Sequence, residues 1–338
     1  MKLVAISGVR QAAAIEVPMP RPVKHWALVK VHTAPLCTEF KAYGAGHTGH
    51  ALGHEACGEV VEVAQPGRVK VGDHVAVMPQ AACSACACCL SGDYIHCQQQ
   101  TDYQAFSGGQ ECTGTMTQYL LKPDWLLPIL PAGMSFDHGA MACCGLGPTF
   151  GAMQRLAADA YDTVLITGLG PVGLGGIING RFRGCRVLGV ESNPYRTRLA
   201  LALGAEAVLD PADPGTLARL RELTGGLGVD KAIDCAGTTD SRRLCIDAAR
   251  RLGQVVFVGE GGDVPVHGSN DMIRKGLTLH GSWHFRMGDV PRLMQVIQRT
   301  APALDQLITH RFPMDGIAAA FDLQLSGQCG KVLLKPWA

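Results

Sequence analysis

The segment DTVLITGLGPVG, residues 162–173, constrains the fold of this 338-residue chain more than any other stretch. It starts with a short apolar run rich in β-branched residues, which predicts a strand buried on both faces. Three glycines follow with the spacing G-x-G-x-x-G: Gly168, Gly170 and Gly173. In a strand–turn–helix, they permit a tight turn, close approach of the backbone to a pyrophosphate, and close helix–strand packing. The segment therefore predicts a dinucleotide-binding turn.

The residues after this motif alternate between strand-like and helix-like patterns. CRVLGVE, AVLD, KAIDCAG, QVVFVG and LTLHGSW read as strands, and segments such as NPYRTRLALALGA read as the helices between them. This alternation predicts a parallel, doubly wound α/β sheet. Pro171 and Val172 would open the first helix, whose N-terminus favours phosphate groups. The candidate cofactor-binding residues of the motif are Gly168, Gly170, Pro171, Val172 and Gly173.

An acidic residue, Glu191, ends the second strand of this region, 18 residues after Gly173. A carboxylate at this place can accept hydrogen bonds from a ribose 2′-hydroxyl and repel a 2′-phosphate. The sequence therefore predicts NAD rather than NADP, although Arg196 and Arg198 nearby leave NADP open as the alternative.

The first 145 residues have a different texture. HWALVKVHTAPLC alternates with period two, GEVVEVA and GDHVAVMP are short β-branched runs, and proline and glycine interrupt them often. This pattern predicts a mostly-β domain.

Composition narrows the possible partners and compartment. A formal net charge of +1 and 17% charged residues argue against a nucleic-acid-binding or basic membrane surface. No run predicts a signal peptide or a transmembrane helix. Fourteen cysteines without an export signal predict a reducing, cytoplasmic compartment, where cysteines bind metal or lie buried more often than they form disulfides.

Five cysteines crowd into CSACACCLSGDYIHC, residues 83–97. Without Cys88 the spacing is C-x2-C-x2-C-x7-C, and four thiolates predict a closed, structural zinc site. A bacterial ferredoxin run would place its fourth cysteine after three residues and before proline, whereas here seven residues intervene and Gln98 follows. Cys88 is then a spare thiol, or replaces Cys86 or Cys89. The predicted ligands are Cys83, Cys86, Cys89 and Cys97.

A second set of candidate ligands, Cys37, His54 and Cys143, is scattered through the chain. Two sulfurs and one imidazole leave a fourth position open, as a catalytic zinc requires. Taken singly, a buried cysteine or a lone histidine more often belongs to the core or to a hydrogen bond. Spacing alone does not join these three residues.

Together these features resemble the zinc-dependent medium-chain alcohol and polyol dehydrogenases. The resemblance runs from KLVAISG to GKVLLKPWA and rests on GHEACGEVVEV, VGDHVAV, the cysteine lobe and the 25 residues from Cys143 to Gly168. It implies a GroES-like, mostly-β catalytic domain over 1–145 with a zinc lobe at about 83–97. A Rossmann NAD-binding domain over 146–284 and a return segment over 285–338 would follow.

By position, the resemblance implies a catalytic zinc held by Cys37, His54 and Cys143, with Glu55 as a carboxylate that can approach the metal. Cys143 is preferred to Cys144 because the family's ligand cysteine lies two residues before a glycine, and Gly145 follows.

The chain departs from the family after the first ligand, where C-G-[ST]-D is replaced by Cys37-Thr38-Glu39. Either one residue is missing and Thr38 is the proton-relay hydroxyl, or Glu39 occupies the relay position. Thr38 is preferred because a hydroxyl both donates and accepts. The loop before His54 is also short, so Tyr43, His47 and His50 can each be a relay, a substrate contact or an ordinary loop residue.

The resemblance implies hydride transfer between an alcohol and NAD, with one catalytic and one structural zinc per chain. Glu39 and the polar run QQQTDYQAFSGGQECTGT favour a polyol, sugar or aminocyclitol secondary alcohol. The alternatives are a simple alcohol dehydrogenase or aldehyde reductase, possibly NADP-linked, and a non-catalytic nucleotide-binding sensor of the same fold. We expect a homodimer or homotetramer that acts on a small molecule, without nucleic-acid or membrane partners.

Overall fold

The computed structural model describes residues 1–110 and 114–338 and divides the chain into two compact units. The first comprises Met1–Cys144, Arg286–Leu304 and Ile308–Ala338, and the second comprises Gly145–Phe285 and Asp305–Leu307. The first unit thus combines the N-terminal region with most of the C-terminal segment. Within the polar run from which the sequence predicts a polyol substrate, Glu111, Cys112 and Thr113 lie outside the described residues.

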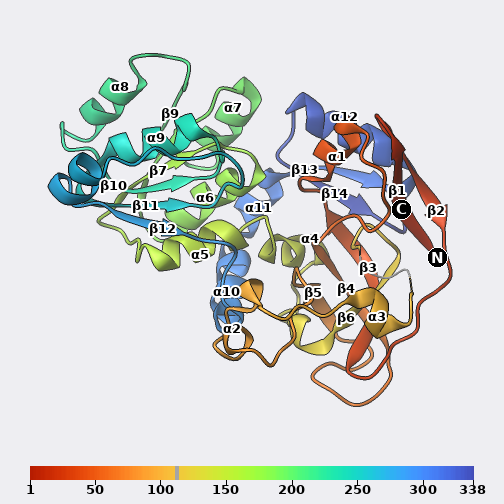
Figure 1. Ribbon diagram of the computed structural model, residues 1–338. Helices are drawn as coiled ribbons and strands as arrows, with labels where there is room; N and C mark the ends of the chain where they lie inside the picture. The colour runs from red at the N-terminus through yellow and green to blue at the C-terminus, as the bar shows by residue number, and fades with distance from the viewer. Residues whose placement is uncertain (111–113) are drawn as a thin grey trace. The chain divides into compact units, whose positions relative to one another are not determined.

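The second unit is a six-stranded parallel sheet with α8 and α9 over one face and α5 on the other (Figure 1). The strand order β12-β11-β10-β7-β8-β9 reverses direction between β7 and β10, and nucleotides bind at such a switch point. The predicted doubly wound sheet is confirmed. Its strands are β7 Thr163–Thr167, β8 Arg186–Val190, β9 Ala207–Leu209, β10 Val229–Asp234, β11 Ala249–Phe257 and β12 Thr278–Gly281. Its helices are α5 Gly147–Arg155, α6 Pro171–Phe182, α7 Pro194–Ala202, α8 Thr216–Leu223 and α9 Thr239–Ala248, with a π-helical turn at Gly268–Arg274.

The first unit is mostly β, as predicted. Its main sheet has the order β13-β14-β3-β4-β5, with β6 paired to β3, while β1 and β2 form a separate hairpin. The strands are β1 Lys2–Gly8, β2 Gln11–Glu16, β3 Trp26–Pro35, β4 Ala56–Val63, β5 His74–Val77, β6 Tyr119–Pro123, β13 Ile308–Pro313 and β14 Lys331–Lys335. The C-terminal strand β14 pairs antiparallel with the end of β3, so the two ends of the chain build one sheet.

Short helices connect these strands. They are α1 Glu39–Ala45, α2 Ala87–Leu90, α3 Tyr103–Ser107, α4 Phe136–Gly139, α10 Val290–Arg299, α11 Ala301–Leu307 and α12 Ile317–Ser326. Single 3₁₀ turns lie at Tyr94–His96, Asp124–Leu126, Ala140–Ala142, Met287–Asp289 and Met314–Gly316.

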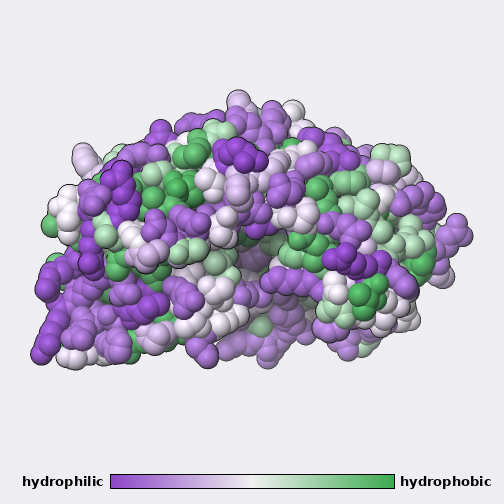
Figure 2. All heavy atoms as spheres, turned by 90° about the horizontal axis from the view of Figure 1, so that it is seen from above, coloured by the Kyte–Doolittle hydropathy of each residue, from purple (hydrophilic) through white to green (hydrophobic). Residues whose placement is uncertain are grey.

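Each unit has its own apolar core. In the first, Val29, Val31 and Phe321 belong to one buried cluster, and in the second Leu165, Ile246 and Val255 belong to another. The surface in Figure 2 mixes hydrophobic patches with hydrophilic ones. None of the helices in the described ranges is long and apolar enough to cross a membrane.

Asp137 of α4 ties three strands of the first unit together. It accepts hydrogen bonds from Thr33 Oγ1 at 2.7 Å, from Lys335 Nζ at 2.6 Å and from Arg311 Nε at 2.8 Å. Burial raises the pKa of Asp137, but these three donors outweigh it and lower the pKa to about 2.

Because the folded protein binds the proton of Asp137 more weakly than the unfolded chain, this network stabilises the fold above about pH 4. The contribution is lost as the pH falls through about 2. We expect Asp137→Asn to lower the free energy of unfolding at pH 7 by about 1–2 kcal/mol after solvent screening. Urea denaturation from pH 7 to pH 2 should show the gap to the unmodified protein closing below pH 4. Asp315→Asn, in an exposed 3.8 Å pair with Lys2, is the control and should leave the free energy of unfolding almost unchanged at every pH. A gap that stays constant with pH would contradict this role.

Candidate active site and metal centres

The cysteine lobe brings together the four thiols predicted from spacing. The sulfurs of Cys83, Cys86, Cys89 and Cys97 all lie within 4.8 Å of one another. Cys88 is half-buried and is not part of the group. Helix α2 turns Cys89 inward, and the lobe is anchored to the C-terminal segment because Met287 N donates to Gly92 O at 2.9 Å.

The lobe fits a zinc ion. Four sulfurs placed tetrahedrally about 2.3 Å from a common centre lie about 3.8 Å from each other. The sulfur–sulfur distances in the structure agree, at 3.9 Å for Cys83–Cys89, 3.6 Å for Cys86–Cys89 and 3.9 Å for Cys86–Cys97. Backbone N–H groups point at the sulfurs, and they lower the pKa of the Cys86 thiol to about 6. These donors favour the thiolate form that binds zinc.

A second cluster gathers residues that are far apart in the sequence. Ligand atoms of Cys37, His54, Glu55 and Cys144 lie within 4.8 Å of one another, all in the first unit. Cys37 follows the end of β3, and His54 and Glu55 immediately precede β4. Gly53 makes the turn before His54 at φ 86°, where a Cβ atom would lie 2.4 Å from Thr115 Oγ1. The donor set of two thiols, an imidazole and a carboxylate suits zinc.

The structure brings Cys144, rather than the predicted Cys143, into the cluster with Cys37 and His54. Cys144 Sγ lies 3.2 Å from His54 Nε2. The thiol of Cys143 instead donates to the carbonyl of Val77 at 3.1 Å and is fully buried. Consecutive side chains leave the backbone in different directions here, since Cys143 follows a 3₁₀ turn with φ −76° and ψ −120°. The ligand cysteine therefore directly precedes Gly145.

Glu39 orients the histidine of the cluster. Glu39 Oε1 lies 3.0 Å from His54 Nδ1, and Glu39 Oε2 accepts the backbone N–H of Cys37 at 3.0 Å. With Nδ1 occupied, Nε2 is the ring nitrogen that faces the other ligands. Burial lowers the pKa of His54, but contacts with Cys37 and Glu39 outweigh it and raise the pKa to about 11. The Cys144 thiol, followed by Lys331 and His54, holds the pKa of Cys37 well below its usual range.

Glu55 is paired with a lysine from the other end of the chain. Both side chains are buried, and Lys331 Nζ donates to Glu55 Oε1 at 2.7 Å. Glu55 Oε2 accepts the backbone N–H of Cys144 at 3.1 Å, so the carboxylate also fixes the third ligand. Burial raises the pKa of Glu55 to about 7, although Lys331 opposes the rise. Sequence reasoning missed Lys331, whose only signal was a lysine inside the apolar run GKVLLK.

The remaining candidates lie outside the cluster. Thr38 is exposed at the N-terminus of α1 and makes no capping hydrogen bond there. Tyr43 is buried, and its hydroxyl donates to Asp322 at 3.3 Å, which ties α1 to α12. His47 is exposed in the loop after α1. The geometry assigns the ligand-orienting contact to Glu39 and leaves the relay role of Thr38 a prediction.

The glycine turn of the second unit has the geometry that the motif predicts. Gly168 has φ 77°, and a Cβ atom there would lie 2.6 Å from Ala236 N. A Cβ atom on Gly173 would lie 2.1 Å from Gly168 O, so only glycine lets α6 pack this closely on β7. The space above Gly170 is open, and Pro171 and Val172 start α6. This cradle fits a diphosphate at the helix N-terminus.

A pocket of about 600 Å³ opens beside this turn at the carboxyl ends of the strands, and Glu191, Ser192 and Ala236 help to line it. Its size suits an adenosine. Backbone N–H groups of Leu169, Ser192 and Asn193 hold the Glu191 carboxylate at 2.8–2.9 Å. The carboxylate is therefore fixed in the pocket wall.

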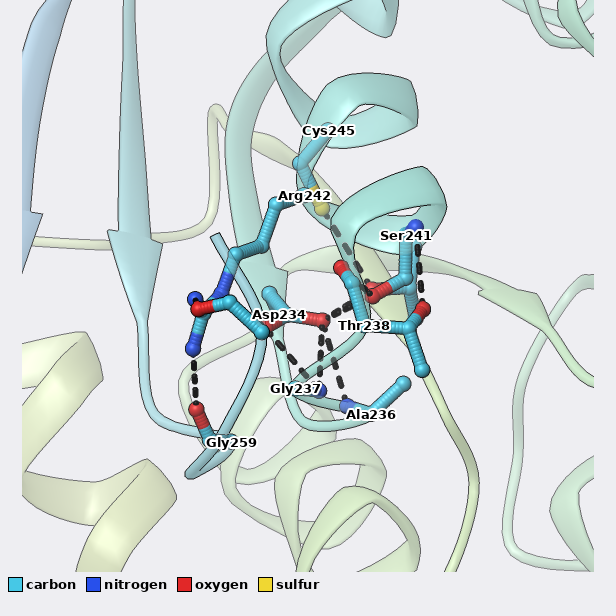
Figure 3. Close-up of polar contacts among 10 residues, drawn as sticks. Asp234, Ala236, Gly237, Thr238, Ser241, Arg242, Cys245 and Gly259 are labelled. Atoms are coloured by element: carbon cyan, nitrogen blue, oxygen red, sulfur yellow. Dashed lines mark hydrogen bonds and ion pairs between the residues drawn. The ribbon is translucent and has the colours of Figure 1, made fainter. Parts of the chain in front are cut away.

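Asp234, at the end of β10, accepts hydrogen bonds from residues that line this pocket, and Figure 3 shows these contacts. It is fully buried and accepts hydrogen bonds from Ser241 Oγ at 2.6 Å and from the backbone of Ala236 and Gly237 at 3.1 and 3.2 Å. Ala236 and Ser241 both line the pocket. Sequence reasoning missed Asp234, although an acidic residue that ends a buried strand before a Cys-Ala-Gly turn was a usable signal.

Two known domain families match the chain. Residues 23–132 match the alcohol dehydrogenase GroES-like domain, and residues 171–299 match the zinc-binding dehydrogenase domain. The Escherichia coli protein YphC, an uncharacterized zinc-type alcohol dehydrogenase-like protein, is 31% identical over 94% of each chain. L-threonine 3-dehydrogenase of Symbiobacterium thermophilum is 30% identical, covering 95% of this chain and 93% of the relative.

A further relative and a solved structure are also similar to the chain. D-arabitol-phosphate dehydrogenase of Enterococcus avium is 28% identical, covering 97% of this chain and 95% of the relative. The solved structure of alcohol dehydrogenase TADH from Thermus sp. ATN1 shares the fold, with a TM-score of 0.90, 24% identity and 99% of each chain covered. With two matching domain families and a relative along nearly its whole length, the chain belongs to the zinc-dependent medium-chain alcohol dehydrogenases and is an oxidoreductase of that family.

Proposed function

We propose that the protein transfers hydride between a polyol or related secondary alcohol and NAD, using a zinc ion held by Cys37, His54 and Cys144. The observation that carries this proposal is the cluster itself, in which Cys144 Sγ lies 3.2 Å from a His54 ring whose Nδ1 is engaged by Glu39. Two sulfurs and one imidazole leave one tetrahedral position for a substrate oxygen. The four thiols of the lobe would hold a second, structural zinc.

When bound, zinc supplies Lewis acidity that lowers the pKa of an alcohol, and NAD supplies the hydride acceptor. The residues of the chain do the rest. Glu39 keeps His54 in the tautomer that offers Nε2, and Lys331 balances the charge of Glu55. Thr38, exposed one residue after Cys37, accepts the hydroxyl proton of the substrate and passes it to solvent.

A secondary alcohol with further polar groups is the substrate class that we favour. Two of the compared relatives are named for L-threonine and D-arabitol phosphate, which both carry a secondary hydroxyl beside other polar groups. The second candidate is a simple alcohol or aldehyde, favoured by the alcohol dehydrogenase name of the Thermus structure.

The proposal is tested by loading the protein with zinc, measuring zinc per chain, and following absorbance of the reduced cofactor over a panel of polyols, amino alcohols and simple alcohols. We expect two zinc ions per chain and the highest kcat/KM for a polyol or amino alcohol. Two zinc ions without turnover of any panel member would overturn the catalytic proposal in favour of a nucleotide-binding sensor.

Cofactor choice can be tested at Glu191, which we take to bind the adenosine ribose. Glu191→Ala should weaken NAD binding about tenfold to a hundredfold, since a charged hydrogen bond is worth about 1.5–3 kcal/mol. The same variant should bind NADP more tightly than the unmodified protein does, because the charge that repels the 2′-phosphate is gone. Glu222→Ala, in an exposed pair with Arg219, is the control. Unchanged NAD affinity by fluorescence titration would remove Glu191 from this role.

We also infer a homodimer or homotetramer in the cytoplasm. Strand β12 is an edge strand of the second unit's sheet, and an open edge can pair with a second copy. No cysteine in the described ranges is in a disulfide, which is typical of a reducing compartment. Light scattering on the purified protein gives the oligomeric state directly.

A further inference from the structure

The second unit has another cavity, at the opposite end of the sheet from the nucleotide pocket. It has a volume of about 500 Å³ and lies where β10 and β11 begin, since Gly228 and Ala249 help to line it. The nucleotide pocket lies at the carboxyl ends of the parallel strands. The six residues of β10 therefore separate the two cavities by about 20 Å. The second cavity does not belong to the cofactor site.

Four cationic side chains converge on this cavity from three parts of the second unit. Arg221 comes from α8, Arg251 from β11, Arg274 from the π-helical turn, and Lys275 directly follows that turn. Arg251 and Arg274 are fixed relative to each other, because Arg251 Nη1 donates to the carbonyl of Arg274 at 2.7 Å. Lys275 Nζ donates to the carbonyls of Ile246 and Asp247, at 2.6 and 3.1 Å, at the end of α9.

The protein does not neutralise this charge from within. Among residues 1–110 and 114–338, no carboxylate forms an ion pair with Arg221, Arg251 or Arg274. The one carboxylate that lines the cavity, Asp247, is held on both oxygens by Arg243, at 3.0 and 2.6 Å. Like charges gathered in a concave site repel each other, and a bound anion would offset that repulsion.

The ligand class follows from the donors. Arginine forms paired, planar hydrogen bonds to phosphate oxygens, and three arginines around one cavity suit a ligand with more than one anionic group. The volume also exceeds what a single phosphate fills and suits a small metabolite. We propose that this cavity binds a small phosphorylated molecule carrying at least two negative charges, at a site separate from the cofactor and the alcohol.

Calorimetric titration of the zinc-loaded protein with inorganic pyrophosphate tests the proposal. Saturating NADH is present, so that the glycine turn is occupied. We expect saturable binding of one pyrophosphate per chain, weakened by added salt. Arg251→Ala and Arg274→Ala should each reduce the affinity about tenfold or more, and Arg251→Lys by less, because it keeps the charge but loses the paired geometry. Citrate in place of pyrophosphate distinguishes phosphate recognition from a general preference for polyanions.

Arg219→Ala is the matched control. It lies on the same helix as Arg221, but it pairs with Glu222 and does not line the cavity. All variants should keep the alcohol turnover of the unmodified protein, which shows that they fold. Absence of saturable binding to the unmodified protein at millimolar pyrophosphate overturns the proposal, and so does equal weakening by Arg219→Ala. If Arg274→Glu dissociates the oligomer in light scattering while pyrophosphate does not bind, the arginines serve a subunit contact and the proposal is wrong.

Discussion

Cys144→Ala is expected to lower kcat/KM by more than about a hundredfold and to remove one of two bound zinc ions, whereas Cys143→Ala should keep both ions and most of the activity. The contacts that surround a zinc ligand are worth about ten- to a hundredfold, so loss of a ligand itself should exceed that range. The Cys143 thiol donates to the carbonyl of Val77 and contributes no atom to the cluster. Its replacement leaves a small packing defect away from the metal.

The two variants form a matched pair, because they remove the same group from neighbouring, buried positions. Zinc per chain by atomic emission and initial rates with the best alcohol are the two measurements. The lobe zinc provides an internal standard, since its four thiols are untouched in both proteins. A loss of zinc and activity in Cys143→Ala alone would restore Cys143 as the ligand and contradict the geometry of the cluster.

Local signals explain what the sequence predicts well. The glycine turn depends on residues 168–173 and the strand before them, and the lobe on cysteines within residues 83–97. In each, all the functional residues lie within a short stretch of sequence, so their spacing is enough to predict the local geometry. The doubly wound sheet is also predictable, because buried parallel strands and amphipathic helices leave different periodicities.

The third catalytic ligand shows where such reasoning stops. Cys143 and Cys144 have the same chemistry, and the backbone angles of Cys143, just after a 3₁₀ turn, decide which sulfur faces His54. Residue types carry no record of those angles. The same limit applies to Glu39, whose contact with His54 depends on how α1 begins and on the shortened loop between α1 and His54.

Long-range polar partners are harder still. Lys331 and Glu55 are 276 positions apart, and their contact exists because β14 joins the sheet that contains β3 and β4. A buried lysine in an apolar strand indicates that a counter-charge must be near, but not which one. Only the fold identifies Glu55 as the partner, and breaking this buried pair should have a large effect on the free energy of unfolding.

Lys331→Met is expected to lower the free energy of unfolding by about 3–5 kcal/mol, because it removes the lysine that pairs with the buried carboxylate of Glu55. Methionine keeps the length and apolar contacts of the lysine stem. The double variant Glu55→Gln with Lys331→Met removes both charges and should recover much of the loss, since a buried pair replaced as a whole costs far less than a pair broken on one side. Urea denaturation of the zinc-loaded proteins gives the free energy of unfolding of the unmodified protein and of both variants. Lys2→Met, which breaks an exposed pair, is the control and should change the free energy of unfolding by less than about 1 kcal/mol.

The double variant also separates stability from chemistry. Glutamine in place of Glu55 can still accept the backbone N–H of Cys144, so the third ligand stays in position while the charge beside the metal is gone. If the double variant is as stable as the unmodified protein but turns over more slowly, the Glu55 carboxylate acts on the reaction and Lys331 serves to keep it charged in the interior. If stability and turnover recover together, the pair is a structural support for Cys144. A double variant no more stable than Lys331→Met would contradict the pairing of these two charges.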